Sequence, residues 1–185
     1  MRVISGKYGG RILKGKMPKG TRPTTDKSRE SLFSMLDNYI YFEGKRVLDC
    51  YAGSGLVGIE FLSRGSDYCT FVEKGGKQIS NLKKFLAELN IPHKDYSIIK
   101  SDVLKFLSSE PELPYSIIFS DAPYDLLSTN EIIKLVENNK WLNDEGFLII
   151  ETSKEENISL SNHYQLVKEK IFGISKLTIL EYSID

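Results

Sequence analysis

The sequence contains only two cysteines and two histidines, so it offers little material for a disulfide framework or a zinc centre. Cys50 and Cys69 stand inside apolar stretches without metal-ligand spacing, and His93 and His163 are far apart. Buried thiols and surface imidazoles are the better interpretation, and no metal site is predicted. No apolar run approaches the length of a membrane span and no signal peptide begins at Met1, so a soluble, cytoplasmic protein is expected.

The chain also lacks net charge, but its charges are unevenly distributed. Residues 1–29 hold nine lysines and arginines against one acid, Asp26, which is a balance of +8. Because the whole chain holds 25 basic and 25 acidic residues, residues 30–185 carry 16 basic and 24 acidic ones, a balance of −8. Such asymmetry favours a polyanionic partner for the basic segment, although a solvated basic tail is about as common.

Segments with strand and helix patterns alternate along most of the chain. Five apolar runs are typical of buried strands: 45–51, 68–73, 96–101, 115–121 and 146–151. Helical patterns fill the intervals: 55–64, 75–90, 103–109 and 129–140. Two final strand-like runs, 164–171 and 175–183, predict a hairpin at the sheet edge. The alternation predicts an α/β fold, with a mostly parallel sheet of about seven strands, helices on both faces and a C-terminal antiparallel hairpin.

The segment before this alternation has a different composition. Residues 1–24 are rich in Gly, Lys and Pro and predict a small, basic, hairpin-like extension. Over residues 25–39, Leu32, Phe33 and Leu36 fall on one helical face. A chain of 185 residues suits one sizeable core with a short appendage, so the main domain is expected to span 25–185.

A glycine-rich loop follows the first predicted strand. Gly53, Gly55 and Gly58 fit the pattern G-x-G-x-x-G, and Glu73 lies twenty positions beyond Gly53. On the pattern alone, a dinucleotide such as NAD is a serious alternative. Asp49 at the mouth of the loop argues against it, because a carboxylate there would repel a pyrophosphate but suit the ammonium group of S-adenosylmethionine. The loop therefore favours S-adenosylmethionine as the cofactor.

Four acidic residues end four consecutive predicted strands: Asp49, Glu73, Asp102 and Asp121. Ligands of such sheets bind outside the carboxyl ends of the strands. Glu73 could accept both ribose hydroxyl protons, whereas Asp102 could accept from the adenine amino group or, with equal weight, cap the helix that follows. Gly53 and Gly55 would let the backbone approach the ligand. The predicted cofactor-binding residues are Asp49, Ala52, Gly53, Ser54, Gly55, Glu73, Lys74, Asp102, Val103 and Asp121.

Five longer motifs stand out: RVISGKYGGRILKG, TRPTTDKSRESLF, LDCYAGSGLVGIEFLSRGS, DAPY and FGISKLTILEY. Together they resemble the RsmD-type 16S rRNA guanine-N2 methyltransferases over almost the whole chain. The resemblance implies a class I, Rossmann-like methyltransferase fold. It also implies methyl transfer from S-adenosylmethionine to the exocyclic amine of one guanine, the guanine(966)-N2 position of 16S rRNA.

The resemblance further implies that the catalytic pocket is lined by Asp121, Ala122, Pro123 and Tyr124. Asp121 and the carbonyl of Ala122 would accept the two amine hydrogens and so aim the nitrogen at the methyl group. Tyr124 would stack on the base, which is worth roughly 1–3 kcal/mol. Ala122 stands where the family has a proline, and the lost restriction on φ predicts a looser loop.

Small-subunit rRNA is the partner that the resemblance implies, in the small ribosomal subunit or an assembly intermediate. The basic segment would then bind phosphates, through Lys7, Arg11, Arg22, Thr24, Lys27 and Arg29. A monomer is expected, because no separate interface segment is visible. Two alternatives stay open: another amino-methyltransferase, acting on DNA adenine or protein glutamine, and a non-catalytic RNA-binding protein whose site has decayed at Ala122.

Overall fold

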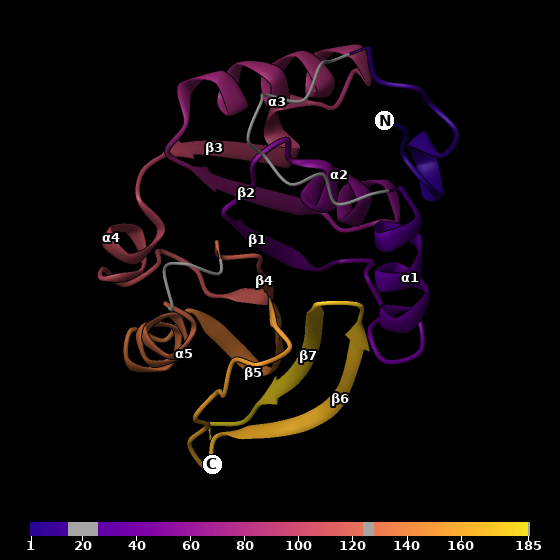
Figure 1. Ribbon diagram of the computed structural model, residues 1–185. Coiled ribbons are helices and arrows are strands. Elements are labelled where there is room, and N and C mark those ends of the chain that lie inside the picture. Colours follow the sequence, from indigo (N-terminus) through magenta and orange to yellow (C-terminus); the bar gives the residue numbers. More distant parts are fainter. Residues whose placement is uncertain (15–25, 124–127, 185) are drawn as a thin grey trace.

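Figure 1 shows the computed structural model, a central sheet with helices on both faces. The structure describes residues 1–14, 26–123 and 128–184. Its strands are β1 (Arg46–Cys50), β2 (Tyr68–Glu73), β3 (Tyr96–Lys100), β4 (Tyr115–Ser120), β5 (Leu142–Ser153), β6 (Tyr164–Phe172) and β7 (Ser175–Tyr182). Within the described part of the chain they form one seven-stranded sheet in the order β3-β2-β1-β4-β5-β7-β6.

The first five strands are parallel, whereas β7 lies antiparallel between β5 and the edge strand β6. The chain builds β1, β2 and β3 outward on one side, then crosses back to place β4 and β5 on the other side of β1. The predicted α/β fold and its C-terminal antiparallel hairpin are confirmed. The strand order reverses beside β1, and sheets of this kind bind their ligands at such a reversal.

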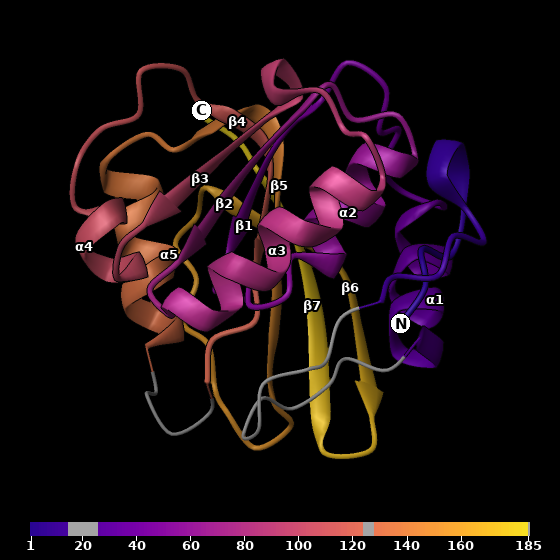
Figure 2. The same cartoon turned by 90° about the horizontal axis from the view of Figure 1, so that it is seen from above.

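The helices are divided between the two faces of the sheet. They are α1 (Asp26–Leu36), α2 (Leu56–Ser63), α3 (Gly76–Glu88), α4 (Val103–Leu107) and α5 (Thr129–Asn138), with short 3-10 turns η1 (Gly6–Tyr8) and η2 (His93–Asp95). One core cluster joins α1, α2 and α3 to one face, and a second joins α4 and α5 to the other (Figures 1 and 2). No helix among the described residues is long and apolar enough to cross a membrane.

The central strands are buried on both faces, which explains their continuous apolar sequences. Val47 and Leu48 are adjacent in β1, yet Val47 packs in the first cluster and Leu48 in the second. Cys50 and Cys69 are both fully buried with free thiols, as the sequence predicts. These two thiols serve as small core side chains.

Residues 1–14 fold back on themselves and pack against the domain. Arg2 and Ile12 form an antiparallel bridge, and Val3, Tyr8 and Leu13 are buried in the first core cluster. This segment is therefore part of the core in its described portion. The predicted boundary between residues 24 and 25 lies outside the described residues, so the proposed division into extension and domain stays a prediction.

Candidate active site

The ends of β1, β2 and β4 lie side by side. Cys50, the last residue of β1, pairs with Val72 on one side and with Ser120 on the other. Asp121 therefore leaves β4 next to the loop that leaves β1. We call this side of the sheet the carboxyl edge and the opposite side the amino edge.

The glycine loop turns sharply at the carboxyl edge. Gly53 and Gly55 have φ angles of 55° and 74°, in the left-handed region where glycine is favoured. A Cβ added to Gly55 would lie 2.2 Å from Leu82 Cδ1, whereas one added to Gly53 would meet only Tyr51 O, at 3.8 Å. Of the two glycines expected to make room for a ligand, only Gly53 has open space beside it. Internal packing already accounts for Gly55.

The backbone of this loop is tied to β2 and to itself. The Ala52 N–H donates to Val72 O at 3.0 Å, and the Gly55 N–H donates to Ala52 O at 2.7 Å. Ser54, at the turn, is half-buried. The loop is therefore held in place at both ends while Gly53 and Ser54 form its outer bend.

Glu73 holds the glycine loop from the end of β2. Its Oε2 accepts the Gly53 N–H at 2.9 Å, and its Oε1 accepts the Gly75 N–H at 2.6 Å. Each carboxylate oxygen has a second lone pair, so the half-buried group can still accept hydrogen bonds from a ligand. Glu73 thus links two loops and stays a candidate acceptor for ribose hydroxyls.

Asp49 is buried beneath the loop. The residue is 1% exposed, and its Oδ2 accepts the Gly58 N–H in the first turns of α2 at 3.0 Å. Its pKa is raised to about 7, mainly by burial, with the nearby charges of Asp121 and Glu73 adding to this effect and the Gly58 hydrogen bond opposing it. The carboxylate is thus enclosed and ties β1 to α2, and the contact with an ammonium group that the sequence suggests stays a prediction.

Asp102 caps the helix that follows β3. Its Oδ1 accepts the N–H groups of Leu104 and Lys105 at 3.0 and 3.3 Å, which confirms the capping alternative. Its Oδ2 lies 3.8 Å from Lys74 Nζ at the surface. The Asp102 side chain does not accept a hydrogen bond from Val103, the first residue of α4. Among the described groups the Val103 N–H has no acceptor, so it can donate to a ligand beside the carboxylate.

The catalytic motif predicted from the sequence begins where β4 ends. Asp121 is half-buried, and its charge acts on Asp49 across the edge. Ala122 is 6% exposed and packs in the second core cluster, while Pro123 is exposed. Tyr124 lies outside the described residues, so its predicted stacking role stays a prediction.

The structure adds Tyr51, which the sequence analysis missed. It is a non-glycine residue with a φ angle of 59°, between β1 and the glycine loop. Its hydroxyl lies 3.4 Å from Ser128 Oγ just before α5, and partial burial raises its pKa. Strained residues of this kind cluster at functional sites. The available signal was an aromatic residue directly between an apolar strand and a glycine loop.

The structure corrects the RNA-binding prediction for Arg29. Its side chain is 1% exposed, and its Nη2 donates to Arg2 O at 2.6 Å and to Asp26 Oδ1 at 2.9 Å. An enclosed guanidinium in these contacts cannot reach an RNA phosphate. Arg29 instead holds the N-terminal segment against α1.

The other basic residues predicted to bind RNA are separated in space. Lys7 and Arg11 are exposed beside the ring of Tyr8. The backbone N–H of Tyr8 donates to Ser63 Oγ at the end of α2. That end points to the amino edge, roughly 12 Å along an eight-residue helix from the glycine loop. Exposed Lys27 is in the first turn of α1, toward the carboxyl edge (Figure 2). Arg22 and Thr24 lie outside the described residues.

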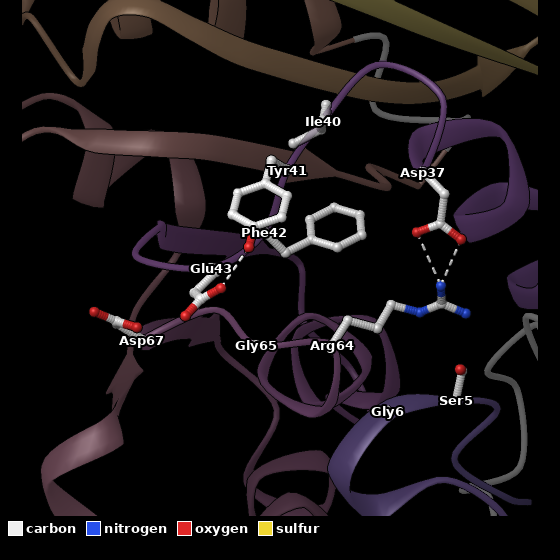
Figure 3. Close-up of a pocket in the computed structure, with 10 residues that line it drawn as sticks. All are labelled: Ser5, Gly6, Asp37, Ile40, Tyr41, Phe42, Glu43, Arg64, Gly65 and Asp67. Carbon is white, nitrogen blue, oxygen red and sulfur yellow. Dashed lines mark hydrogen bonds and ion pairs between the residues drawn. The ribbon is translucent and has the colours of Figure 1, made fainter.

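A pocket of about 570 Å³ opens at the amino edge (Figure 3). Arg64 points across it, and its Nη1 lies 3.0 and 2.8 Å from the two carboxylate oxygens of Asp37. The Tyr41 hydroxyl donates to Glu43 on the opposite wall. The predicted catalytic and cofactor residues are absent from the described lining, and the principal charges already have partners. This pocket is therefore not the candidate active site.

Known proteins resemble this chain over nearly its full length. A family model described as "Conserved hypothetical protein 95" matches residues 1–181. A ribosomal RNA small subunit methyltransferase D from Buchnera aphidicola subsp. Acyrthosiphon pisum is 40% identical over 169 residues, which is 91% of this chain and 86% of that protein. The chain belongs to the RsmD family. This confirms the resemblance seen in its sequence motifs.

Solved structures agree with this family membership. A putative methyltransferase, yhhF from Escherichia coli, superposes with a TM-score of 0.87 at 31% identity and covers 100% of this chain and 99% of that one. A more distant match, the putative methyltransferase SMU.776 complexed with SAH, has a TM-score of 0.66 at 13% identity, over 84% of this chain and 48% of that one. At this low identity, the second match supports only the fold of the RsmD-family chain.

Proposed function

We propose that this protein transfers a methyl group from S-adenosylmethionine to the exocyclic N2 amine of a guanine in small-subunit rRNA. The observation that carries the proposal is the set of carboxylates at the carboxyl edge. Asp49, Glu73 and Asp121 lie close enough for the last two to raise the pKa of the first, beside a glycine loop. In a chain of the RsmD family, this is the expected place for a methyl donor and its acceptor amine.

The residues at this edge fit S-adenosylmethionine. The open space beside Gly53 leaves room for a ligand close to the backbone, and Glu73 retains lone pairs for ribose hydroxyls. At the neighbouring strand end, the Val103 N–H can donate to an adenine ring nitrogen while Asp102 Oδ2 accepts from its amino group. The negative charges of Glu73 and Asp121 suit a cationic ligand and would oppose the pyrophosphate of NAD.

S-adenosylmethionine supplies, when bound, an electrophilic methyl group on its sulfonium. Asp121 accepts one hydrogen of the guanine N2 amine, and the Ala122 carbonyl accepts the other, which orients the nitrogen lone pair toward that methyl group. The nitrogen's proton passes to an Asp121 carboxylate oxygen or to water. Because the amine needs no strong base, most of the acceleration comes from alignment and proximity.

The target amine requires a base that has left its stack. Guanine N2 lies on the minor-groove edge, and a base stacked in a helix cannot turn this amine into an enclosed pocket. An unpaired loop nucleotide, or one flipped out of its stack, is therefore the substrate we expect. Tyr124 follows Pro123 directly and is our candidate for stacking on that base.

The test is methyl transfer from labelled S-adenosylmethionine to small ribosomal subunits that lack the modification. Naked 16S rRNA runs beside the subunits, and nucleoside mass spectrometry identifies the product. Label in N2-methylguanosine supports the proposal, and the two substrates show whether an assembled subunit is required. Cofactor binding without N2-methylguanosine would overturn the proposal and direct attention to DNA adenine or protein glutamine. Nicotinamide binding without S-adenosylmethionine binding would overturn the cofactor as well.

A further inference from the structure

The β6–β7 hairpin turns at the carboxyl edge. Ser175, the first residue of β7, pairs with Ser153 on β5 and with Phe172 on β6. β4 already ends at Ser120, which pairs with Ile150, three residues before Ser153. At about 3.3 Å per strand residue, the hairpin turn stands roughly 10 Å beyond the end of β4. Figure 2 shows the hairpin projecting at this end of the sheet.

The hairpin tip exposes apolar surface. Ile171 near the end of β6 and Ile174 in the turn are 58% and 60% exposed. Lys170 Nζ lies 4.8 Å from the centre of the Phe172 ring, which holds the ammonium group close to the tip. Single exposed aliphatic residues are ordinary, but two beside a cation on a projecting turn form a surface suited to a partner with apolar faces and negative charge.

The charge of this hairpin opposes that of its surroundings. Residues 168–176 contain three lysines and one glutamate, a balance of +2 within a region, residues 30–185, that totals −8. Lys176 donates to Glu156 O at 2.8 Å and lies 3.8 Å from Glu169. Among the described residues, Lys168 and Lys170 have no carboxylate at ion-pair distance. These two lysines are the cations available to a polyanion.

The two lysines lie on the face of the sheet that α1 covers. Lys168 pairs with Ile179 and Lys170 with Leu177, and both partners belong to the core cluster beneath α1, α2 and α3. Lys27, at the start of α1, is on the same side. Because Arg29 is enclosed and Lys7 lies toward the amino edge, the hairpin adds two cations to that of Lys27 at the carboxyl edge.

We infer that the β6–β7 hairpin tip binds the RNA that flanks the target guanine. Lys168 and Lys170 contact its phosphates, and Ile174 packs against a neighbouring unstacked base. The inference rests on the proposed function, since it concerns the substrate of the same site. It adds the C-terminal hairpin to the basic N-terminal segment as a surface that binds and positions RNA.

The experiment compares two tip variants with two matched controls. Lys168→Ala/Lys170→Ala removes both cations, and Ile174→Asp places a negative charge at the exposed turn. The controls are Lys134→Ala, at an exposed position on α5, and Leu166→Asp, at a 53% exposed position at the other end of β6. Affinity for a 16S rRNA transcript is measured across salt concentrations, together with cofactor affinity, thermal unfolding and KM for unmodified subunits.

The tip variants are expected to weaken RNA affinity about tenfold and to raise KM for subunits, with cofactor affinity and melting temperature unchanged. Loss of two phosphate contacts should lower the salt slope by about 1.4, since each contributes roughly 0.7 for single strands. If the wild-type protein methylates subunits but both tip variants keep their RNA affinity, the hairpin inference is wrong and the proposed function stands. A wild-type protein that binds cofactor but methylates no RNA overturns the proposed function instead.

Discussion

Acidic residues at the two edges of the sheet differ in what they bind. At the carboxyl edge, Asp49 and Glu73 accept hydrogen bonds from backbone amides. At the amino edge, Asp37 and Glu60 bind the guanidinium of Arg64, and Glu60 accepts two backbone amides as well. A guanidinium neutralises a carboxylate, whereas an amide only solvates it. The comparison shows why one acidic edge is suited to a cationic cofactor and the other is part of the scaffold.

The largest difference between the edges should appear in catalysis. Asp121→Ala removes the acceptor that orients the amine, so turnover should fall by at least about 100-fold, as for the loss of one preorganised hydrogen-bonding group. Cofactor affinity should change by less than about threefold. Single-turnover methylation and equilibrium cofactor binding measure the two quantities. Asp37→Ala, an acid of the amino edge, should keep turnover near the wild-type value. An equal loss of cofactor affinity and turnover in Asp121→Ala would contradict the assigned role.

The amino edge, in contrast, should matter most for the stability of the fold. Glu60 is 1% exposed and accepts the N–H groups of Ile4 and Ser5 at 2.8 and 3.0 Å, as well as Arg64 Nε at 2.9 Å. Glu60→Gln places an amide N–H₂ among these donors and leaves Arg64 without its buried partner. The free energy of unfolding should fall by about 3 kcal/mol, measured by urea denaturation. Glu43→Gln, at an exposed position, should change it by less than about 0.5 kcal/mol. Equal stabilities of the two variants would contradict the structural role of Glu60.

The pKa of Asp49 predicts a pH dependence at the carboxyl edge. Burial raises that pKa from 3.8 to about 7, so between these values the folded protein holds a proton that the unfolded chain has lost. From this group, the free energy of unfolding should therefore decrease as pH rises from about 4 to 7, by up to about 1 kcal/mol per pH unit. Asp49→Asn should remove this contribution, measured by urea denaturation at several pH values. An identical slope in wild type and variant would show that Asp49 does not titrate in this window.

The smallest effect concerns the cap at Asp102. Asp102→Ala should lower the free energy of unfolding by about 1 kcal/mol, because the N–H groups of Leu104 and Lys105 lose their acceptor. Asp102→Asn retains a capping oxygen and should keep most of this stability. Comparing cofactor affinity in the two variants separates the cap from any contact with adenine. If both bind the cofactor as wild type does, Asp102 acts as a cap alone.

Local patterns in the sequence predict most of this fold. The strands β1, β2 and β4 are largely apolar because both of their faces are covered, whereas the edge strand β3 is half-buried. The chain positions of the acids that follow these strands predict that they lie near the strand ends. β5 is an informative exception, since it begins at Leu142 and includes the polar stretch 143–145. Its pairing with Tyr115, across a register shift, extends the strand through residues that resemble a turn. Tertiary pairing there overrides local composition.

The environment of each site residue was harder to predict. Asp49 and Arg29 both look like exposed functional charges in the sequence, yet each is enclosed by another element of the fold. Asp49 is covered through α2, and Arg29 through residues near the N-terminus. Sequence spacing identifies which residues reach an edge of the sheet, but only the packed structure shows which side chains remain accessible.

The anchoring of the N-terminal segment has a consequence for synthesis. Ile4 and Ser5 are synthesised before their hydrogen-bond acceptor, Glu60, which follows 56 and 55 residues later in the chain. On a translating ribosome, the basic segment must therefore wait, undocked, until α2 has emerged and folded. During this interval the free, strongly positive segment would be attracted to the ribosome's own RNA.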